Sequence, residues 1–444
     1  MKRLIFVLIS IIIAVHAGPA KNLIRAGLRH PIEPPPPNAS PLPLQPMIDT
    51  ASPGDTIRLA PGLYAGPITI TKPIVLDGQY MATIDAGGRG SVIYLKTDSA
   101  HIKNLRLQNS GSSHDQLDAG IQIRGNYNII ENVRIENCLF GMDLQNVEHN
   151  LIVNNEISSK EELPLAIKGD AIRLWYSRYN KVISNYWHDV RDMVVWYSLF
   201  NFFQGNLGIG NRYSIHFMYS HNNRIQNNEF HNNSVGVFLM YSAATIMINN
   251  TITGSNRPDA MCLGMKETSS NEIIGNRFLY SSVGVYIDHS PFEEFKTNIF
   301  ERNEIAFCNV GVQFHSELEG NVFRFNIFKD NLSQVAVRGN TANDNVWEYN
   351  CWDDFQGFDR DDDNIGDTPY VLLEYVEHLW DNKPEVRFFF GTPVLALLDF
   401  LEKLAPFTPP RLILEDPYPV YYCKDIKDIT RFSETVVEKN ASSK

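Results

Sequence analysis

Cysteine is scarce in this 444-residue chain, and the five cysteines lie far apart in the sequence. Cys138, Cys262, Cys308, Cys351 and Cys423 include no Cys-x-x-Cys pair, which argues against a zinc ribbon. Their small, odd number also argues against a dense disulfide framework, while one or two disulfides remain open.

Positive charge is also in short supply. The formal net charge is −12 at pH 7, and removal of Lys2 and Arg3 with an N-terminal leader would lower it to −14. Because nucleic acids require a basic protein face, this charge argues against a nucleic-acid-binding function.

Long apolar runs are missing except at the N-terminus. Lys2 and Arg3 precede an apolar run from Leu4 to Val15, and Ala17 closes a triplet that resembles a small-residue cleavage site. The run is too short to span a membrane, so we predict a secretory signal over residues 1–17, with a retained N-terminal anchor as the alternative. We therefore expect an exported chain whose membrane contact runs only through a partner.

Residues 18–47 are rich in proline, with four consecutive prolines at 34–37, and predict a stiff extended linker. After about residue 66 the chain repeats with a period near 22 residues. Three ladders share one register: Ser177, Ser198, Ser220, Ser242 and Thr268; Asn180, Asn201, Asn223, Thr245 and Asn271; and Asn185, Asn206, Asn228, Asn250 and Asn276. An apolar ladder, Val182, Phe203, Ile225, Met247 and Ile273, stands between the two Asn ladders.

A fixed period of this length indicates a stacked solenoid. Helical repeats are usually longer, and the Leu-x-x-Leu-x-Leu frame of leucine-rich repeats is absent. Short β-branched segments separated by Asn and Gly favour strands and tight turns. We therefore predict an all-β, right-handed parallel β-helix over residues 48–352, with inward aliphatic side chains and Asn amides that bond from coil to coil.

Strand alternation predicts which side chains face outward. Val237 and Leu239 should point into the core, so that Phe238 and Met240 point out. Alignment of the coils then gives an outer column of Trp175, Trp196, Met218 and Met240, with His216 beside Met218. Outward strand faces normally carry polar residues, so this stripe is expected to be covered by a loop, to form a partner surface or to bind a ligand.

Copper is one candidate ligand for this stripe. Thioether sulfur and imidazole suit Cu(I), and His216, Met218, His221 and Met240 are the primary candidates. Met261 and Met265 are further candidates in the next coil, although strict alignment points Met265 inward. The competing interpretation is an interface in which Trp175, Trp196 and Phe238 meet a partner.

An Asp-rich loop follows the last coil, over residues 353–370. Asp359, Asp361, Asp363 and Asp367 take positions 1, 3, 5 and 9 of a D-x-D-x-D calcium loop, with Asn364 at the turn position. Position 12 is Tyr370, so the bidentate glutamate of an EF-hand is missing. A calcium site and a solvated acidic turn are both open interpretations.

The segment 371–420 is expected to dock on a partner through a helix over residues 393–406. Thr392 can cap it, Pro393 suits its first turn and Pro406 ends it. The helix would be apolar nearly all round, so it is expected either to cap the β-helix or to meet a membrane partner. Its candidate docking residues are Phe389, Leu395, Leu398, Phe400 and Leu401. Residues 421–444 are short and charged, and predict a disordered tail.

Catalysis is the alternative function. Many parallel β-helices cleave or epimerise acidic polysaccharides, and residues 286–290 are loosely similar to a pectate-lyase segment. Neither an Arg-x-Pro-x-x-Arg motif nor an Asp-Pro-His-Glu stretch accompanies it. Acid–base catalysis needs such positioned partners, so we expect a protein that is not an enzyme, with a polysaccharide lyase, epimerase or sugar-binding protein as the alternative.

Several stretches together resemble the nitrous oxide reductase maturation family NosD. They are Gly169–Ser177, Ile215–His221, Asn233–Ser242, Asn350–Asp354, the Asp-rich loop to Tyr370, and Pro393–Pro406. The resemblance implies a periplasmic protein that acts with the ABC transporter formed by NosF and NosY. It implies that copper arrives from the lipoprotein NosL, is held transiently, and serves the copper–sulfur centre of the reductase NosZ. It also makes transporter docking the preferred role of the 393–406 helix.

Overall fold

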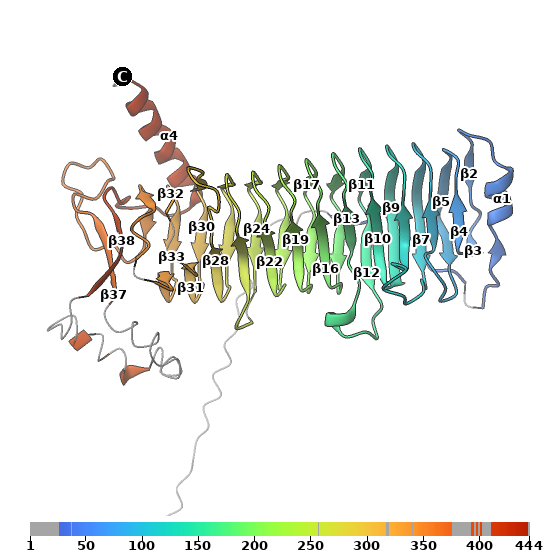
Figure 1. Cartoon of the computed structure of the whole chain (residues 1–444), viewed down its shortest axis with the longest axis horizontal. Coiled ribbons are helices and arrows are strands. Elements are labelled where there is room, and N and C mark those ends of the chain that lie inside the picture. Colours follow the sequence, from blue (N-terminus) through green and yellow to red (C-terminus); the bar gives the residue numbers. More distant parts are fainter. Residues whose placement is uncertain are drawn as a thin grey trace, which may run out of the picture.

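The structure is a computed structural model. It describes residues 26–36, 38–255, 257–316, 319–339, 341–374, 392–394, 397, 400–401 and 410–442. The signal predicted over residues 1–17 lies outside the described residues. The main body is a parallel β-helix of about 13 coils with about 23 residues each (Figure 1), which confirms the predicted fold class.

One wall of the β-helix is a parallel sheet of twelve strands, each hydrogen-bonded to its equivalent in the next coil. Its strands are β4 (Ile68–Ile70), β6 (Ile93–Leu95), β8 (Ala119–Ile123), β10 (Phe140–Gln145), β13 (Ile172–Trp175), β16 (Asp192–Trp196), β19 (Tyr213–Met218), β22 (Val235–Met240), β25 (Met261–Lys266), β28 (Val283–Asp288), β31 (Val310–Phe314) and β34 (Ser333–Val337). This wall carries the predicted outer column.

The other two walls form one continuous sheet of 24 strands. Three long strands, β5 (Val75–Asp85), β7 (His101–Gln108) and β9 (Ile129–Cys138), run through both walls. One wall continues with β2 (Thr56–Arg58), β11 (Leu151–Val153), β14 (Lys181–Ile183), β17 (Phe202–Gln204), β20 (Arg224–Gln226), β23 (Ile246–Ile248), β26 (Glu272–Ile274), β29 (Asn298–Glu301), β32 (Asn321–Arg324) and β35 (Val346–Glu348). The other continues with β1 (Leu42–Pro43), β3 (Gly62–Ala65), β12 (Glu156–Ser159), β15 (Tyr186–His188), β18 (Leu207–Ile209), β21 (Glu229–His231), β24 (Thr251–Thr253), β27 (Arg277–Leu279), β30 (Glu304–Ala306), β33 (Ile327–Lys329) and β36 (Cys351–Trp352).

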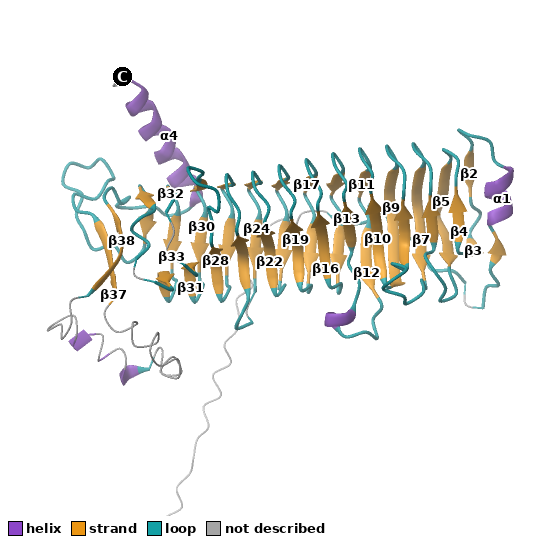
Figure 2. Cartoon of the chain, in the orientation of Figure 1, coloured by secondary structure: helices purple, strands orange, loops and turns teal. Residues whose placement is uncertain are grey.

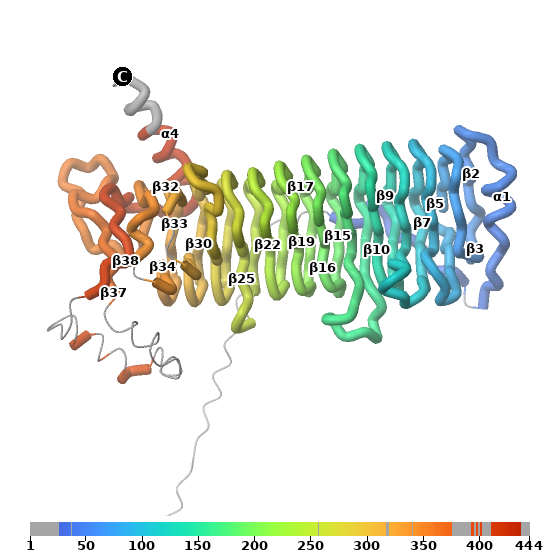
Figure 3. Tube along the Cα trace, in the orientation of Figure 1, coloured from blue at the N-terminus to red at the C-terminus, as the bar shows by residue number. Residues whose placement is uncertain are grey.

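The core follows the predicted alternation. Val237 and Leu239 are fully buried, while Phe238 and Met240 are only partly buried on the outer side of the same strand. The apolar ladder from Val182 to Ile273 is also fully buried. Since each coil buries its aliphatic residues against those of its neighbours, the coils stabilise one another along the axis, and Figure 3 shows them following in sequence order.

Buried asparagines hold the corners of the coils together. In the longest ladder each Asn offers its Oδ1 to both the backbone N–H and the Nδ2 of the Asn one coil earlier, as Asn228 does for Asn206 at 2.9 Å each. This ladder runs from Asn155 to Asn350, across coil lengths of 21 to 30 residues. A buried amide without a partner would be costly, so the pattern specifies the register of the stack.

The N-terminal end of the β-helix is covered by helix α1 (Gln45–Thr50), whose Ile48 is buried in the core. Residues 26–36, which precede α1, lie along the outside of the coils. They run antiparallel to the axis of the β-helix, from a middle coil back toward its N-terminal end. Gly27 N–H donates to Ser184 O at 2.8 Å, and Glu33 N–H donates to Tyr80 O at 2.9 Å. This part of the predicted linker is therefore fastened to the solenoid.

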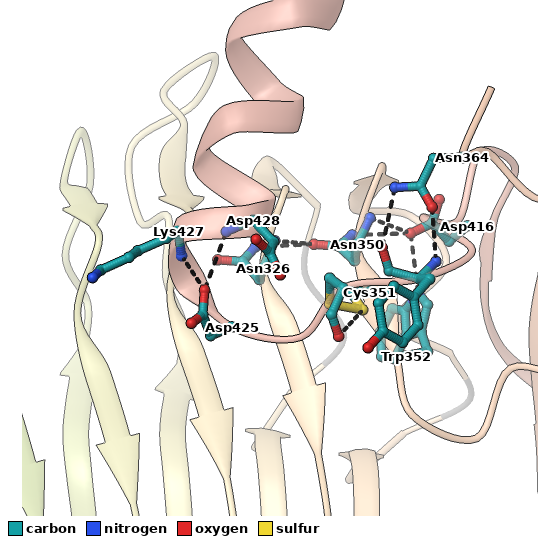
Figure 4. Close-up of a disulfide and its surroundings, with 11 residues drawn as sticks. Asn326, Asn350, Cys351, Trp352, Asn364, Asp416, Asp425, Lys427 and Asp428 are labelled. Atoms are coloured by element: carbon teal, nitrogen blue, oxygen red, sulfur yellow. Dashed lines mark hydrogen bonds between the residues drawn. A yellow bond between two sulfur atoms is a disulfide. The ribbon is translucent and has the colours of Figure 1, made fainter.

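The C-terminal end carries a separate two-stranded antiparallel sheet, β37 (Tyr370–Glu374) with β38 (Arg411–Asp416). A disulfide joins Cys351 in the last coil to Cys423 (Figure 4), while Cys138, Cys262 and Cys308 are free and buried. The three remaining thiols lie inside the coils.

The predicted disordered tail was wrong for residues 426–442, which form helix α4 (Ile426–Ser442; Figure 2). Asp425 accepts the backbone N–H groups of Lys427 at 2.9 Å and Asp428 at 3.2 Å, which caps the helix start. Ile429 is buried in a small cluster with Phe325, and apolar residues at helical spacing support it. Amphipathic spacing and capping outweighed the charged composition. No helix among the described residues has the length and apolar character that membrane crossing requires.

Candidate metal centre on the outer face

The predicted outer column is present in register. Trp175 pairs with Trp196, Trp196 with Met218, and Met218 with Met240, on β13, β16, β19 and β22. All four side chains are partly buried on the outer side of the wall. The column continues into Lys266, where the apolar stripe ends in a charge.

His216 lies beside Met218 on β19 and is surrounded by aromatic rings. Tyr213 stacks on it with ring centroids 4.9 Å apart and an interplanar angle of 19°. Trp196 and Phe238 stand nearly perpendicular to it, at 6.0 and 6.1 Å. The imidazole is therefore walled on three sides by carbon.

Neither ring nitrogen of His216 has a hydrogen-bond partner among the described residues, although both nitrogens are buried. Desolvation lowers the pKa of His216 to about 4, and the charges of Arg212 and Arg191 act in the same direction. The imidazole is thus neutral at ordinary pH and retains a lone pair. An unpartnered buried polar group is costly, so such a histidine indicates a ligand-binding role.

The remaining copper candidates are placed differently. Met265 is fully buried and pairs with Leu239, so its candidacy was wrong: the strand period of two directs its side chain into the core. Met261 is on the outer side, and its sulfur, with the ring of Phe238, fills the space over Gly264. His221 lies in the turn after β19, where its Nδ1 accepts the Ala243 N–H at 3.0 Å.

A stacked tyrosine ladder borders the column, and we did not predict it. Tyr176, Tyr197, Tyr219 and Tyr241 stack with centroids 4.8 to 5.2 Å apart and angles of 7 to 13°. All four adopt φ near +50°, which turns each ring outward at the corner of its coil. The signal was visible in the sequence, because a Tyr-Ser pair follows the column residue in four successive coils.

Carboxylates near His216 are already engaged. Asp192 accepts bonds from Arg212, including one from Nε at 2.9 Å, and Asp170 accepts Arg191 Nη2 at 2.9 Å. Both acids are buried, and burial raises the pKa of Asp170 to about 6. The donors left for a ligand at this place are therefore imidazole nitrogen and thioether sulfur.

The Asp-rich loop brings three of its four predicted residues together. Ligand oxygens of Asp359, Asp361 and Asp363 all lie within 4.8 Å of one another. Asn364 has φ of +66°, as expected at the turn position. Asp367 is not part of this group, and its carboxylate accepts the Arg360 N–H at 2.9 Å.

The predicted docking segment is described only in part. Phe389, Leu395 and Leu398 lie outside the described residues. Phe400 and Leu401 are exposed, by 56% and 44%, and both are helical. Their exposure leaves apolar side chains in solvent near the C-terminal end of the β-helix.

The central coils match a family model described as "Periplasmic copper-binding protein (NosD)", over residues 156–357. A protein of Pseudomonas aeruginosa named "Probable ABC transporter binding protein NosD" is 27% identical over 386 residues, which cover 78% of this chain and 84% of that protein. A protein of the same name from Stutzerimonas stutzeri is 24% identical over 381 residues, or 79% and 83% of the two chains. The chain is thus similar to NosD proteins over most of its length.

Solved structures share the fold of this chain. A PL6 alginate lyase in complex with a trisaccharide has a TM-score of 0.50 at 13% identity, and the match covers 69% of this chain and 81% of the lyase. The catalytic domain of a GH87 α-1,3-glucanase in complex with nigerose has a TM-score of 0.54 at 13% identity, with 72% and 71% covered. At this identity the likeness shows the parallel β-helix alone.

Proposed function

We propose that this chain is a periplasmic copper-handling protein that acts with an ABC transporter in the maturation of nitrous oxide reductase. The single observation that carries the proposal is His216, whose buried nitrogens have no partner among the described residues and which stands beside Met218 and Met240. The description of the family as copper-binding and the names of the two relatives support it.

The donors fit Cu(I) better than other common metals. Thioether sulfur is a soft ligand that favours Cu(I), and neutral imidazole binds it without first losing a proton. Met218 and Met240 are register partners in adjacent coils, about 4.8 Å apart along the axis. Both sulfurs and the imidazole can therefore reach one ion, with His221 in the adjoining turn as a further donor.

Docking to the transporter is the second part of the proposal. The exposed apolar side chains of Phe400 and Leu401 belong to the segment between β37 and β38, at the end of the β-helix. We propose that this segment meets the transporter formed by NosF and NosY, while the outer column exchanges copper with NosL and NosZ. Cargo handling and membrane attachment are then carried by different parts of one chain.

Copper binding is tested with the purified mature protein and a chromophoric Cu(I) chelator as competitor. We expect one Cu(I) per chain, and at least a hundredfold loss of affinity in the triple variant His216→Ala, Met218→Ala, Met240→Ala. Met81→Ala is the matched control, because Met81 is an exposed methionine outside the column. An unchanged affinity in the triple variant, with its circular dichroism intact, would remove the site.

Docking is tested by deleting the segment between β37 and β38, with end points chosen from the pairing of these two strands. Glu374 and Arg411 are direct partners across β37 and β38, so an Asn-Gly turn can replace residues 375–410 and keep both strands. We expect the deleted protein to lose association with the transporter in a pull-down from detergent and to keep its copper affinity. Retained association would contradict the docking role.

A polysaccharide lyase, epimerase or sugar-binding protein remains the second candidate. The stretch from Tyr286 to Ser290 places Asp288 against Lys266 at 3.6 Å and against His289 at 2.7 Å on the outer side. These charged side chains lie close together on the outer side of the β-helix. Incubation with a panel of uronate polymers, followed by ultraviolet absorbance for unsaturated products and by NMR for epimerised residues, tests the enzymatic candidates, and product formation would replace the copper proposal.

A further inference from the structure

Trp196 occupies a particular place in the proposed copper site. It precedes Met218 in the outer column, and its ring is nearly perpendicular to that of His216, at 6.0 Å. Its Nε1 is buried and has no hydrogen-bond partner among the described residues. The indole therefore lies at the site without a structural hydrogen bond that accounts for its presence.

Other rings hold Trp196 in position. Trp175 lies 5.7 Å away at 57°, and Arg173 lies over the Trp175 ring at 4.5 Å from its centroid. Trp175 also contacts Tyr197 edge-on at 5.5 Å. Since its neighbours are packed on the side away from His216, the indole is a fixed wall rather than a mobile cover.

An indole beside a metal ion has two physical effects. Its π-system attracts a cation, most strongly for Trp among the aromatic residues. It also excludes water, and Cu(II) prefers a tetragonal set of nitrogen and oxygen donors that this wall cannot supply. The nearest carboxylates cannot compensate, because Asp192 and Asp170 are bonded to arginines.

We infer that Trp196 is a specificity-determining residue, whose indole contacts a Cu(I) ion held by His216, Met218 and Met240 and closes the site to Cu(II) and water. The inference rests on the proposed function, since it concerns the same site. It adds the residue that selects the oxidation state of the cargo. Trp196 acts here as a non-coordinating wall, distinct from the three donors.

The experiment compares wild type with Trp196→Leu and Trp196→Phe, and uses Trp347→Phe, in strand β35 several coils away from the site, as the matched control. Cu(I) and redox-inert Ag(I) are titrated while tryptophan fluorescence is recorded, and Cu(I) and Cu(II) affinities are measured by competition. We expect Cu(I) to quench wild type and Trp347→Phe, and to quench Trp196→Phe much less, because the indole nearest to the ion is gone. In Trp196→Leu, Cu(I) affinity should fall about tenfold and air oxidation of the bound ion should accelerate.

The outcomes separate this inference from the proposal beneath it. If wild type binds neither Cu(I) nor Ag(I), the proposed function fails and takes the inference with it. If wild type binds Cu(I) but Trp196→Leu keeps the same affinity, the same preference over Cu(II) and the same oxidation rate, the role of Trp196 is overturned while the copper site stands. Near-ultraviolet circular dichroism of the metal-free variants verifies that the wall has been changed without unfolding the coils.

Discussion

Removing the carboxylate of Asp416 should destabilise the C-terminal end of the β-helix by about 4 kcal/mol. Asp416 is fully buried at the end of the long Asn ladder (Figure 4). Its Oδ2 accepts the Asn350 N–H at 3.0 Å, the Asn350 Nδ2 at 3.1 Å and the Trp352 Nε1 at 3.1 Å. Asp416→Ala leaves these donors without that acceptor, and each costs about 1 to 3 kcal/mol. Asn350 Nδ2 keeps a second bond to Phe323 O, so only the Asn350 N–H and the Trp352 Nε1 lose this acceptor without a replacement. Two such donors together cost about 2 to 6 kcal/mol, and the expected loss of about 4 kcal/mol is the middle of that range.

Asp416→Asn is the informative comparison. The amide oxygen can accept the same three bonds, and it continues the ladder with the residue type used from Asn155 to Asn350. Burial raises the pKa of Asp416, so the charged form is disfavoured there. We therefore expect Asp416→Asn to cost much less than Asp416→Ala, about 1 to 2 kcal/mol, because its Nδ2 replaces only the Oδ1 that accepts the Tyr418 N–H at 3.1 Å. Glu415→Ala, an exposed neighbour on β38, is the control.

The assay is urea-induced unfolding, followed by tryptophan fluorescence and by hydrogen exchange at Asn350, Cys351 and Trp352. Exchange at these amides should accelerate in Asp416→Ala and remain slow in the other two variants, because the damage is local to the last coil. If Asp416→Ala were as stable as wild type, or if Asp416→Asn were equally destabilised, the ladder-end acceptor would not be what holds this module.

Three further outcomes are expected. The pKa of His216 is lowered from 6.5 to about 4, so on acidification the unfolded chain takes up a proton before the folded chain does, and the folded state loses stability as the pH is lowered. Between pH 7 and pH 5, wild type should therefore lose about 2 kcal/mol more unfolding free energy than His216→Phe in urea titrations. Equal losses in the two proteins would contradict a desolvated imidazole. Calcium should raise the midpoint of thermal unfolding by about 2 to 4 °C, and magnesium should raise it by less. Neither ion should change the midpoint of the double variant Asp359→Asn, Asp361→Asn. A wild-type midpoint that does not depend on calcium would favour a solvated turn. Asn228→Ala should cost about 4 kcal/mol in chemical denaturation, because the N–H and Nδ2 of Asn206 lose their acceptor, and a cost under 1 kcal/mol would refute the ladder's role.

The repeat was predictable because strand and coil geometry are periodic. A side-chain period of two decided that Phe238 and Met240 face outward, and equal coil lengths placed Met218 over Met240. The same geometry pointed Met265 inward, and the structure agrees. The sequence therefore predicted each residue of the outer column correctly.

The rest depends on contacts that no repeat encodes. The disulfide of Cys351 with Cys423 spans 72 residues, and α4 packs through Ile429 on a coil that precedes it by about 100 residues. Among the described residues, the His216 nitrogens lack hydrogen-bond partners because three aromatic rings, from the same coil and the two neighbouring coils, surround the imidazole. Periodicity places a side chain on a face, but it does not say which groups remain without partners.

Because the coils stack evenly, distance along the axis of the β-helix is proportional to the number of coils. Five strand steps separate β19, which carries His216, from β34 in the last coil of that wall, so the two lie about 24 Å apart along the axis. A cargo at the outer column is thus held at a constant standoff from whatever the C-terminal end is fastened to. Insertion or loss of one whole coil would change that span by a single step of about 4.8 Å and leave both ends intact, so reach toward a docked protein can be tuned in whole units.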